Sequence, residues 1–80
     1  MPNYKPLDGA DEDVILGLAE CNMCVSQTAK KVYLAQYTTW KRIYKIRTLT
    51  GLDPLNFYDL VELVQAVKDG KLQEMSKSSN

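Results

Sequence analysis

One fifteen-residue segment, residues 36–50, restricts the possible fold more than any other part of the chain. Its core positions recur at spacings of four, three and three residues and are Thr39, Ile43, Ile46 and Leu49. This spacing aligns them along one face of an α-helix. Gly51 follows where a left-handed residue commonly ends a helix. The opposite face has Trp40 at its edge and contains Tyr37, Thr38, Lys41, Tyr44, Lys45 and Thr48. The segment is therefore predicted to be an amphipathic helix that buries one face.

A first helix is predicted from about residue 11 to residue 21. Asp8 or Asp11 can cap it, and Glu12 and Asp13 suit the positive end of the helix dipole. Its apolar residues fall at helical spacing and form a core face of Val14, Ile15 and Leu18. Without a histidine or a pocket-forming fold, the carboxylates of residues 8–13 are interpreted as a solvated helix start and not as an acid/base pair.

A second, shorter helix is expected over residues 27–33, with Ser26 as its N-cap. Ala29 and Val32 would lie on its inner face. Ala29 is small, as expected where another helix crosses closely. A short turn at residues 34–35 would then lead into the helix at 36–50.

A fourth helix is predicted between Asn56, which can cap it, and Gly70, which is a natural stop. Phe57 lies near its start, and its inner stripe is formed by Leu60, Leu63, Val64 and Val67. No strand signal exceeds this helical pattern, and there is no internal repeat. The sequence predicts an all-α fold, a small four-helix helix-turn-helix domain over residues 11–70. Residues 1–10 are expected to be a flexible arm, and residues 71–80 a polar, disordered tail.

Charge is unevenly distributed along the chain, although the formal net charge is zero. The segment from residue 21 to residue 52 contains no acidic residue and six basic ones: Lys30, Lys31, Lys41, Arg42, Lys45 and Arg47. The other segments hold all ten acidic residues and four basic ones. A small domain polarised in this way can present a basic face to phosphates. The alternative is a chance cluster on a solvated surface.

The segment from 26 to 50 fits the template of a helix-turn-helix motif. Such a motif needs a small residue at the helix crossing, a tight turn, and a second helix that keeps its N-terminal half free for the major groove. Gln36, Thr38 and Lys41 can hydrogen-bond base edges. Ser26 can meet a phosphate, as can the basic residues Lys30, Lys31, Arg42, Lys45 and Arg47. The alternative is an ordinary helical bundle with basic solvated faces.

The same segment resembles a known family. The residues that carry the resemblance run ungapped from Cys24 to Leu52 and are Val25-Ser26-Gln27-Thr28-Ala29-Lys30-Lys31-Val32-Tyr33-Leu34, Tyr37-Thr38-Thr39, Lys41-Arg42-Ile43, Ile46 and Leu49-Thr50-Gly51-Leu52. They are similar to the C-terminal helix-turn-helix domain of PucR-type bacterial transcription regulators and, more distantly, to the DNA-binding end of the Fis protein. The resemblance implies that Ser26 and Thr28 lie at the start of the first motif helix. It also implies a recognition helix that carries Gln36, Tyr37, Thr38, Trp40, Lys41 and Arg42.

The favoured function is sequence-specific binding of double-stranded DNA in transcriptional control. A single module of this size binds weakly, so a homodimer is expected, with the fourth helix as the candidate contact. In the alternative, the same fold serves protein–protein interaction, as in an accessory or assembly protein of a phage or mobile element. The family has a His-Arg pair where this chain has Ala35 and Gln36, and Asn where it has Tyr37. These departures and the zero net charge favour the alternative.

Other classes of function find little support in the sequence. Cys21 and Cys24 form a Cys-x-x-Cys pair, but a zinc site needs about four ligands and the chain has no histidine and no other cysteine. A redox or metal module at this pair remains a third hypothesis. No phosphate-cradling glycine loop is present. We expect no enzyme, no cofactor and no metal. The absence of a signal peptide and of an apolar run long enough to span a bilayer predicts a cytoplasmic protein.

Overall fold

The chain folds into helices only, within the part that the structure describes. This computed structural model describes residues 6–74 and contains α1 (Gly9–Glu20), α2 (Val25–Lys31), α3 (Gln36–Thr50) and α4 (Phe57–Lys68), followed by a helical turn at residues 72–74. The predicted all-α fold is confirmed. Among the described residues, no helix is long and apolar enough to cross a membrane.

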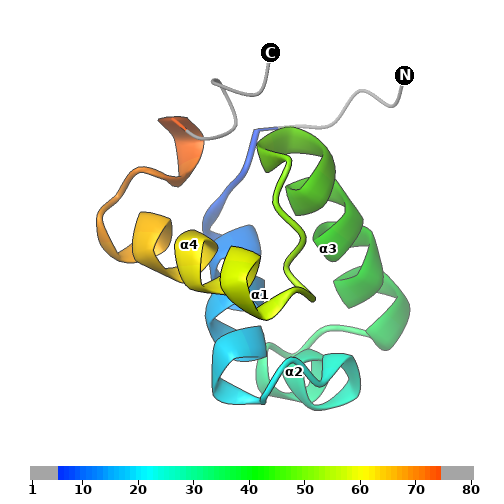
Figure 1. The fold of residues 1–80 in the computed structure, drawn as a ribbon. Coiled ribbons are helices and arrows are strands. Elements are labelled where there is room, and N and C mark those ends of the chain that lie inside the picture. Colours follow the sequence, from blue (N-terminus) through cyan, green and yellow to red (C-terminus); the bar gives the residue numbers. More distant parts are fainter. Residues whose placement is uncertain (1–5, 75–80) are drawn as a thin grey trace.

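Helix α1 lies at the centre of the fold and contacts each of the other three helices, while α2 also contacts α3. In Figure 1, α4 crosses in front of α1, α3 lies on the right, and α2 lies at the bottom beside the end of α1. The predicted core face of α1 is fully buried, because Val14, Ile15 and Leu18 each have 0% exposure. This central position makes α1 the support on which the other helices are oriented.

Helix α1 begins two residues earlier than predicted, because Asp8 and Asp11 form a reciprocal capping box. The Asp11 amide donates to Asp8 Oδ1 at 3.1 Å, and the Asp8 amide donates to Asp11 Oδ2 at 3.0 Å. Two otherwise unpaired backbone donors at the helix start are thereby satisfied. Both aspartates suggested as caps therefore act together.

Helix α2 is shifted by two residues from its predicted position. Its N-cap is Cys24, without a side-chain cap hydrogen bond, so Ser26 is a residue of the helix and the prediction of Ser26 as N-cap is wrong. Val25 is 9% exposed, so burial of an apolar side chain fixes the start of the helix. Tyr33, at φ 60°, is in the left-handed region and ends the helix early.

Helix α3 has the predicted bounds. Its core face is buried at Thr39, Ile43 and Ile46, and Leu49 packs against this core at its margin. Thr39 Oγ1 donates to the Ala35 carbonyl at 3.1 Å, which lets a polar side chain occupy a fully buried position. Gly51 ends the helix in the left-handed conformation at φ 76°.

Helix α4 begins after Asn56, whose side chain accepts a hydrogen bond from the Asp59 amide at 3.1 Å. Leu60 and Leu63 are buried, whereas Val64 and Val67 are partly buried against the core. Phe57 packs outside this stripe and is 60% exposed. The fourth helix therefore closes the core with one face and presents apolar side chains on another.

Two leucines in the segments that were predicted to be flexible belong to the folded part of the chain. Leu7 and Leu72 are each 2% exposed and belong to the hydrophobic core. The predicted arm at residues 1–10 therefore does not extend to residues 7–10, and the predicted tail at 71–80 does not include the helical turn at 72–74. Each leucine is a large apolar side chain in a mostly polar segment, and its burial in the core removes apolar surface from water. Residues 1–5 and 75–80, which also belong to those two predictions, lie outside the described residues.

Candidate nucleic-acid interface

The connection between α2 and α3 is short and well ordered by backbone hydrogen bonds. It consists of residues 32–35, where the Val32 amide donates to the Thr28 carbonyl at 3.0 Å and the Leu34 amide donates to the Ala29 carbonyl at 2.9 Å. Ala29 is 4% exposed, and its small side chain lets α2 pack closely against its neighbours. The short connection and the packing of α2 on α3 fix how the first turns of α3 are presented to solvent.

The N-terminal half of α3 presents polar and aromatic side chains to solvent. Gln36, Tyr37 and Lys41 are exposed, and Thr38 is partly exposed. Lys41 Nζ lies 5.5 Å from the centre of the Tyr37 ring, in a cation–π contact that holds both side chains on the same face. Thr38 and Lys41 also line a shallow hollow on this face, together with Arg42, Tyr44 and Lys45.

Trp40 lies at the edge of the α3 face, as predicted, and is partly buried. Its indole packs against the hydrophobic core, and its ring centre lies 6.0 Å from that of Tyr44 in a stacked arrangement. Tyr44 itself is 52% exposed. Trp40 therefore combines a packing role with a limited exposed edge.

The predicted contact residues on α2 divide into exposed and buried positions. Ser26 and Lys30 are exposed, and Lys31 is exposed but forms an ion pair with Glu20, with Lys31 Nζ 3.1 Å from Oε1. The hydrogen bond to this carboxylate raises the pKa of Lys31. Thr28 is fully buried where α2 crosses α1, so its side chain does not face solvent and the sequence-based assignment of Thr28 to the interface must be corrected.

Two of the predicted phosphate contacts on α3 are engaged inside the protein. Arg42 Nη1 lies 3.1 Å from Asp11 Oδ1, and Lys45 Nζ lies 2.7 Å from Asp11 Oδ2. Arg42 Nη1 is also 3.5 Å from Asp8 Oδ1. The Lys45 side chain is only 11% exposed. The sequence predicted both cations as phosphate contacts, but in the structure they connect α3 to the first turn of α1.

The interpretation of residues 8–13 as a solvated helix start is wrong for Asp11, because Asp11 is 0% exposed. It lies one turn before the buried stripe of α1 and therefore points to the same side. Asp8 remains exposed. The backbone N–H of Asp11 holds the pKa of the Asp8 carboxyl below the usual value. Helical spacing alone could have shown that Asp11 is on the buried side of the helix.

Three of the basic residues that were predicted to contact DNA remain free at the surface. No acidic partner for Lys30, Lys41 or Arg47 is present in residues 6–74, and all three side chains are exposed. Tyr33, in the connection, is 94% exposed beside the start of α3 and was not singled out from the sequence. A left-handed tyrosine in a turn has no simple sequence signal, because this conformation usually selects glycine or asparagine.

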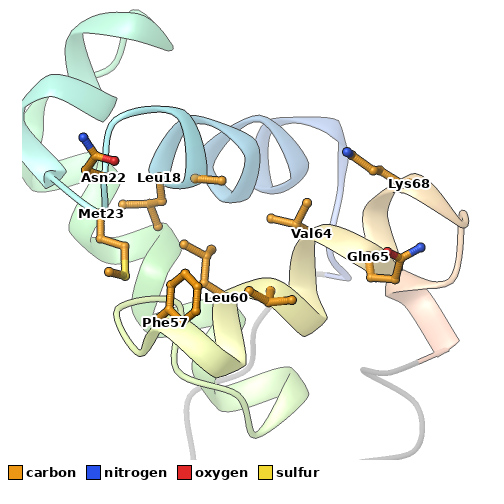
Figure 2. A pocket seen from close by; sticks show the side chains of 10 residues that line it. Leu18, Asn22, Met23, Phe57, Leu60, Val64, Gln65 and Lys68 are labelled. Atoms are coloured by element: carbon orange, nitrogen blue, oxygen red, sulfur yellow. The ribbon is translucent and has the colours of Figure 1, made fainter.

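A second candidate surface lies between α1 and α4, away from α3. It is an apolar groove of about 300 Å³. Figure 2 shows Phe57, Leu60 and Val64 of α4 on one side, with Leu18 of α1 and the turn residue Met23 on the other. Lys68 lies at one end of the groove. Phe57 and its neighbour Tyr58 have ring centres 5.5 Å apart and are both largely exposed.

Cys21 and Cys24 are free thiols in the turn that joins α1 to α2, and both are partly exposed. The structure brings together no group of three or more potential metal ligands among the residues that it describes. Comparisons with protein-family models, with curated proteins and with solved structures find no match to the chain. The PucR-type resemblance therefore stays a prediction that rests on the quoted residues.

Proposed function

We propose that this chain binds double-stranded DNA as a helix-turn-helix protein, with the N-terminal half of α3 in the major groove. One observation carries the proposal: α2 and the short connection support α3 from behind, while Gln36, Tyr37 and Lys41 stay exposed on its first turns. A recognition helix needs this combination of a supported back and a free N-terminal face.

The proposed contacts follow from the chemistry of the exposed side chains. The Gln36 amide and the Lys41 ammonium can reach base edges, where glutamine suits adenine and lysine suits guanine. Lys30 and Arg47 can neutralise phosphates, and the exposed hydroxyl of Ser26 can donate to one. Arg42 and Lys45 position α3 through Asp11 in this proposal.

Binding of duplex DNA by Lys41→Ala tests this proposal. Fluorescence anisotropy with a mixed-sequence duplex at two salt concentrations should show affinity that falls steeply with salt, because phosphate contacts release counterions. Lys41→Ala should weaken binding about tenfold, in line with the ~1–3 kcal/mol of a base contact. The matched control is Lys68→Ala, which removes an exposed lysine from α4 and should leave the affinity nearly unchanged. Absence of binding at low salt would reject the proposal.

The biological form of this activity is also part of the proposal. A regulator of transcription in the cytoplasm would act as a homodimer on a two-fold site, with the exposed face of α4 contributing to the contact.

The second candidate function is protein–protein interaction, and the exposed apolar side chains of Phe57, Tyr58 and Val61 favour it. Sedimentation of wild type and Val61→Glu would show whether this face joins two copies.

A further inference from the structure

The turn between α1 and α2 brings two thiols to the ends of one β-turn. Cys21 is the C-cap of α1 and Cys24 is the N-cap of α2. The Cys24 amide donates to the Cys21 carbonyl at 3.0 Å, which closes the turn. The central residues Asn22 and Met23 have φ values of 55° and 64°. Two positive φ values at these positions are characteristic of a type I′ turn.

A β-turn places its first and last Cα atoms within about 7 Å of each other. A disulfide needs a Cα separation of roughly 4.4–6.8 Å, so a turn of this kind brings the two cysteine backbones close to the separation that a disulfide spans. Both thiols are free and partly exposed, which leaves them accessible to a small reagent. We propose that Cys21 and Cys24 form a reversible intramolecular disulfide by exchange with a low-molecular-weight disulfide such as glutathione disulfide.

Cys24 is the thiol that attacks first in this proposal. The backbone N–H of Gln27 is the main cause that lowers the pKa of the Cys24 thiol, and Ser26 Oγ lies 4.0 Å from Cys24 Sγ. A lower pKa increases the fraction of thiolate, which is the reactive form. Gln27 and Ser26 are both in the first turn of α2, so the activating groups come with the fold.

The exchange proceeds in two steps. The Cys24 thiolate attacks one sulfur of glutathione disulfide, the glutathione S–S bond breaks, and one glutathione thiolate leaves. The Cys21 thiolate then attacks Cys24 Sγ in the mixed disulfide and displaces the second glutathione thiolate. Both cysteines lose one electron each, one glutathione disulfide becomes two glutathione thiols, and those thiols take up the two cysteine protons.

The bond would fix a turn that the core already holds in place. The Met23 amide donates to the Leu18 carbonyl at 2.7 Å, and the Met23 side chain packs against the core at the edge of the α1–α4 groove. The turn hydrogen bond keeps the backbones of Cys21 and Cys24 near each other, which favours closure of the disulfide within the fold. The inference does not depend on DNA binding.

The test is incubation of the full chain with glutathione disulfide, followed by acid quenching, alkylation of free thiols and intact-mass measurement. Wild type should lose two hydrogen atoms, resist alkylation and carry no glutathione, and dithiothreitol should restore both thiols. Cys21→Ser should retain one glutathione on Cys24, because the resolving thiol is missing. The oxidised wild type should melt at a temperature no lower than that of the reduced protein.

Two outcomes would overturn the proposal. Wild type that keeps glutathione adducts, or forms only disulfides between chains, would show that the two sulfurs do not meet. An oxidised form that has lost helical circular dichroism or melts at a lower temperature would show that the folded turn does not accommodate the bond.

Discussion

Asp11 is the residue on which most of the polar organisation of the fold depends. Its backbone and carboxylate complete the capping box of α1, and the same carboxylate binds Arg42 and Lys45 of α3. A buried charge is costly unless cations and hydrogen bonds surround it, and this one has both. Removal of the carboxylate would leave two partly buried cations without their partner.

Asp11→Ala is expected to destabilise the fold by about 3 kcal/mol, the scale for breaking a buried ion pair from one side. Asp13→Ala removes an exposed carboxylate two residues further along the same helix and should stay within about 0.5 kcal/mol of wild type. Urea unfolding followed by circular dichroism measures both values. Equal stabilities of the two variants would contradict the role assigned to Asp11.

Asp8 provides a prediction about pH. The Asp11 backbone N–H holds the Asp8 pKa below its ordinary value of 3.8, so the ionised carboxylate is favoured in the folded state. Its contribution to stability is therefore present above about pH 4 and is lost as pH falls through the lowered folded-state pKa. Asp8→Asn keeps an oxygen acceptor for the cap but cannot ionise.

Wild type should accordingly be more stable than Asp8→Asn at neutral pH, and this difference should disappear towards about pH 2. Urea unfolding of both proteins across this pH range gives the comparison. A stability difference that stays constant over the range would show that the carboxylate charge has no part in the cap.

At the scale of elements, the helix predicted over residues 36–50 agrees with α3 residue by residue, because its apolar spacing and Gly51 define both faces and one end. The bounds of α2 could not be predicted in the same way. Ser26 is an equally good cap by type, and only the tertiary burial of Val25 selects the earlier start. Tyr33 ends α2 in a conformation that its residue type does not announce.

Gly17 shows a role that helix propensity alone conceals. A Cβ atom at this position would lie 3.0 Å from Thr28 Cγ2 and 3.4 Å from Val32 Cγ1. Its absence lets α1 and α2 approach closely, a function that the sequence suggested only for Ala29. The weak helix propensity of glycine is thus compensated by packing between the two helices.

Gly17→Ala is expected to destabilise the fold by about 1 kcal/mol, since overpacking exceeds the gain in helix propensity. Thr28→Ser removes the obstructing methyl group, so the penalty should vanish when both substitutions are combined. Gly9→Ala is the matched control in the same helix, because nothing lies within 4 Å of its added Cβ. Thermal unfolding reports all three, and a stabilising Gly17→Ala would refute the close crossing.

For the whole molecule, the sequence predicted a larger free basic surface than the fold presents. Six basic residues between positions 21 and 52 suggested a basic face. The fold pairs three of them with carboxylates from outside that segment: Lys31 with Glu20, and Arg42 and Lys45 with Asp11. Charge counted along the chain cannot reveal such pairing, because it depends on which helices meet. The proposed interface rests on the cations that remain, Lys30, Lys41 and Arg47.

In the proposed function, DNA meets the exposed start of α3, and amide chemical-shift mapping by NMR locates the surface that DNA contacts. A short duplex added at low salt should perturb the amides of residues 26–30 and 33–41 most strongly. Perturbations concentrated on α4, or spectra unchanged by DNA at low salt, would contradict the assignment of α3 as the recognition helix.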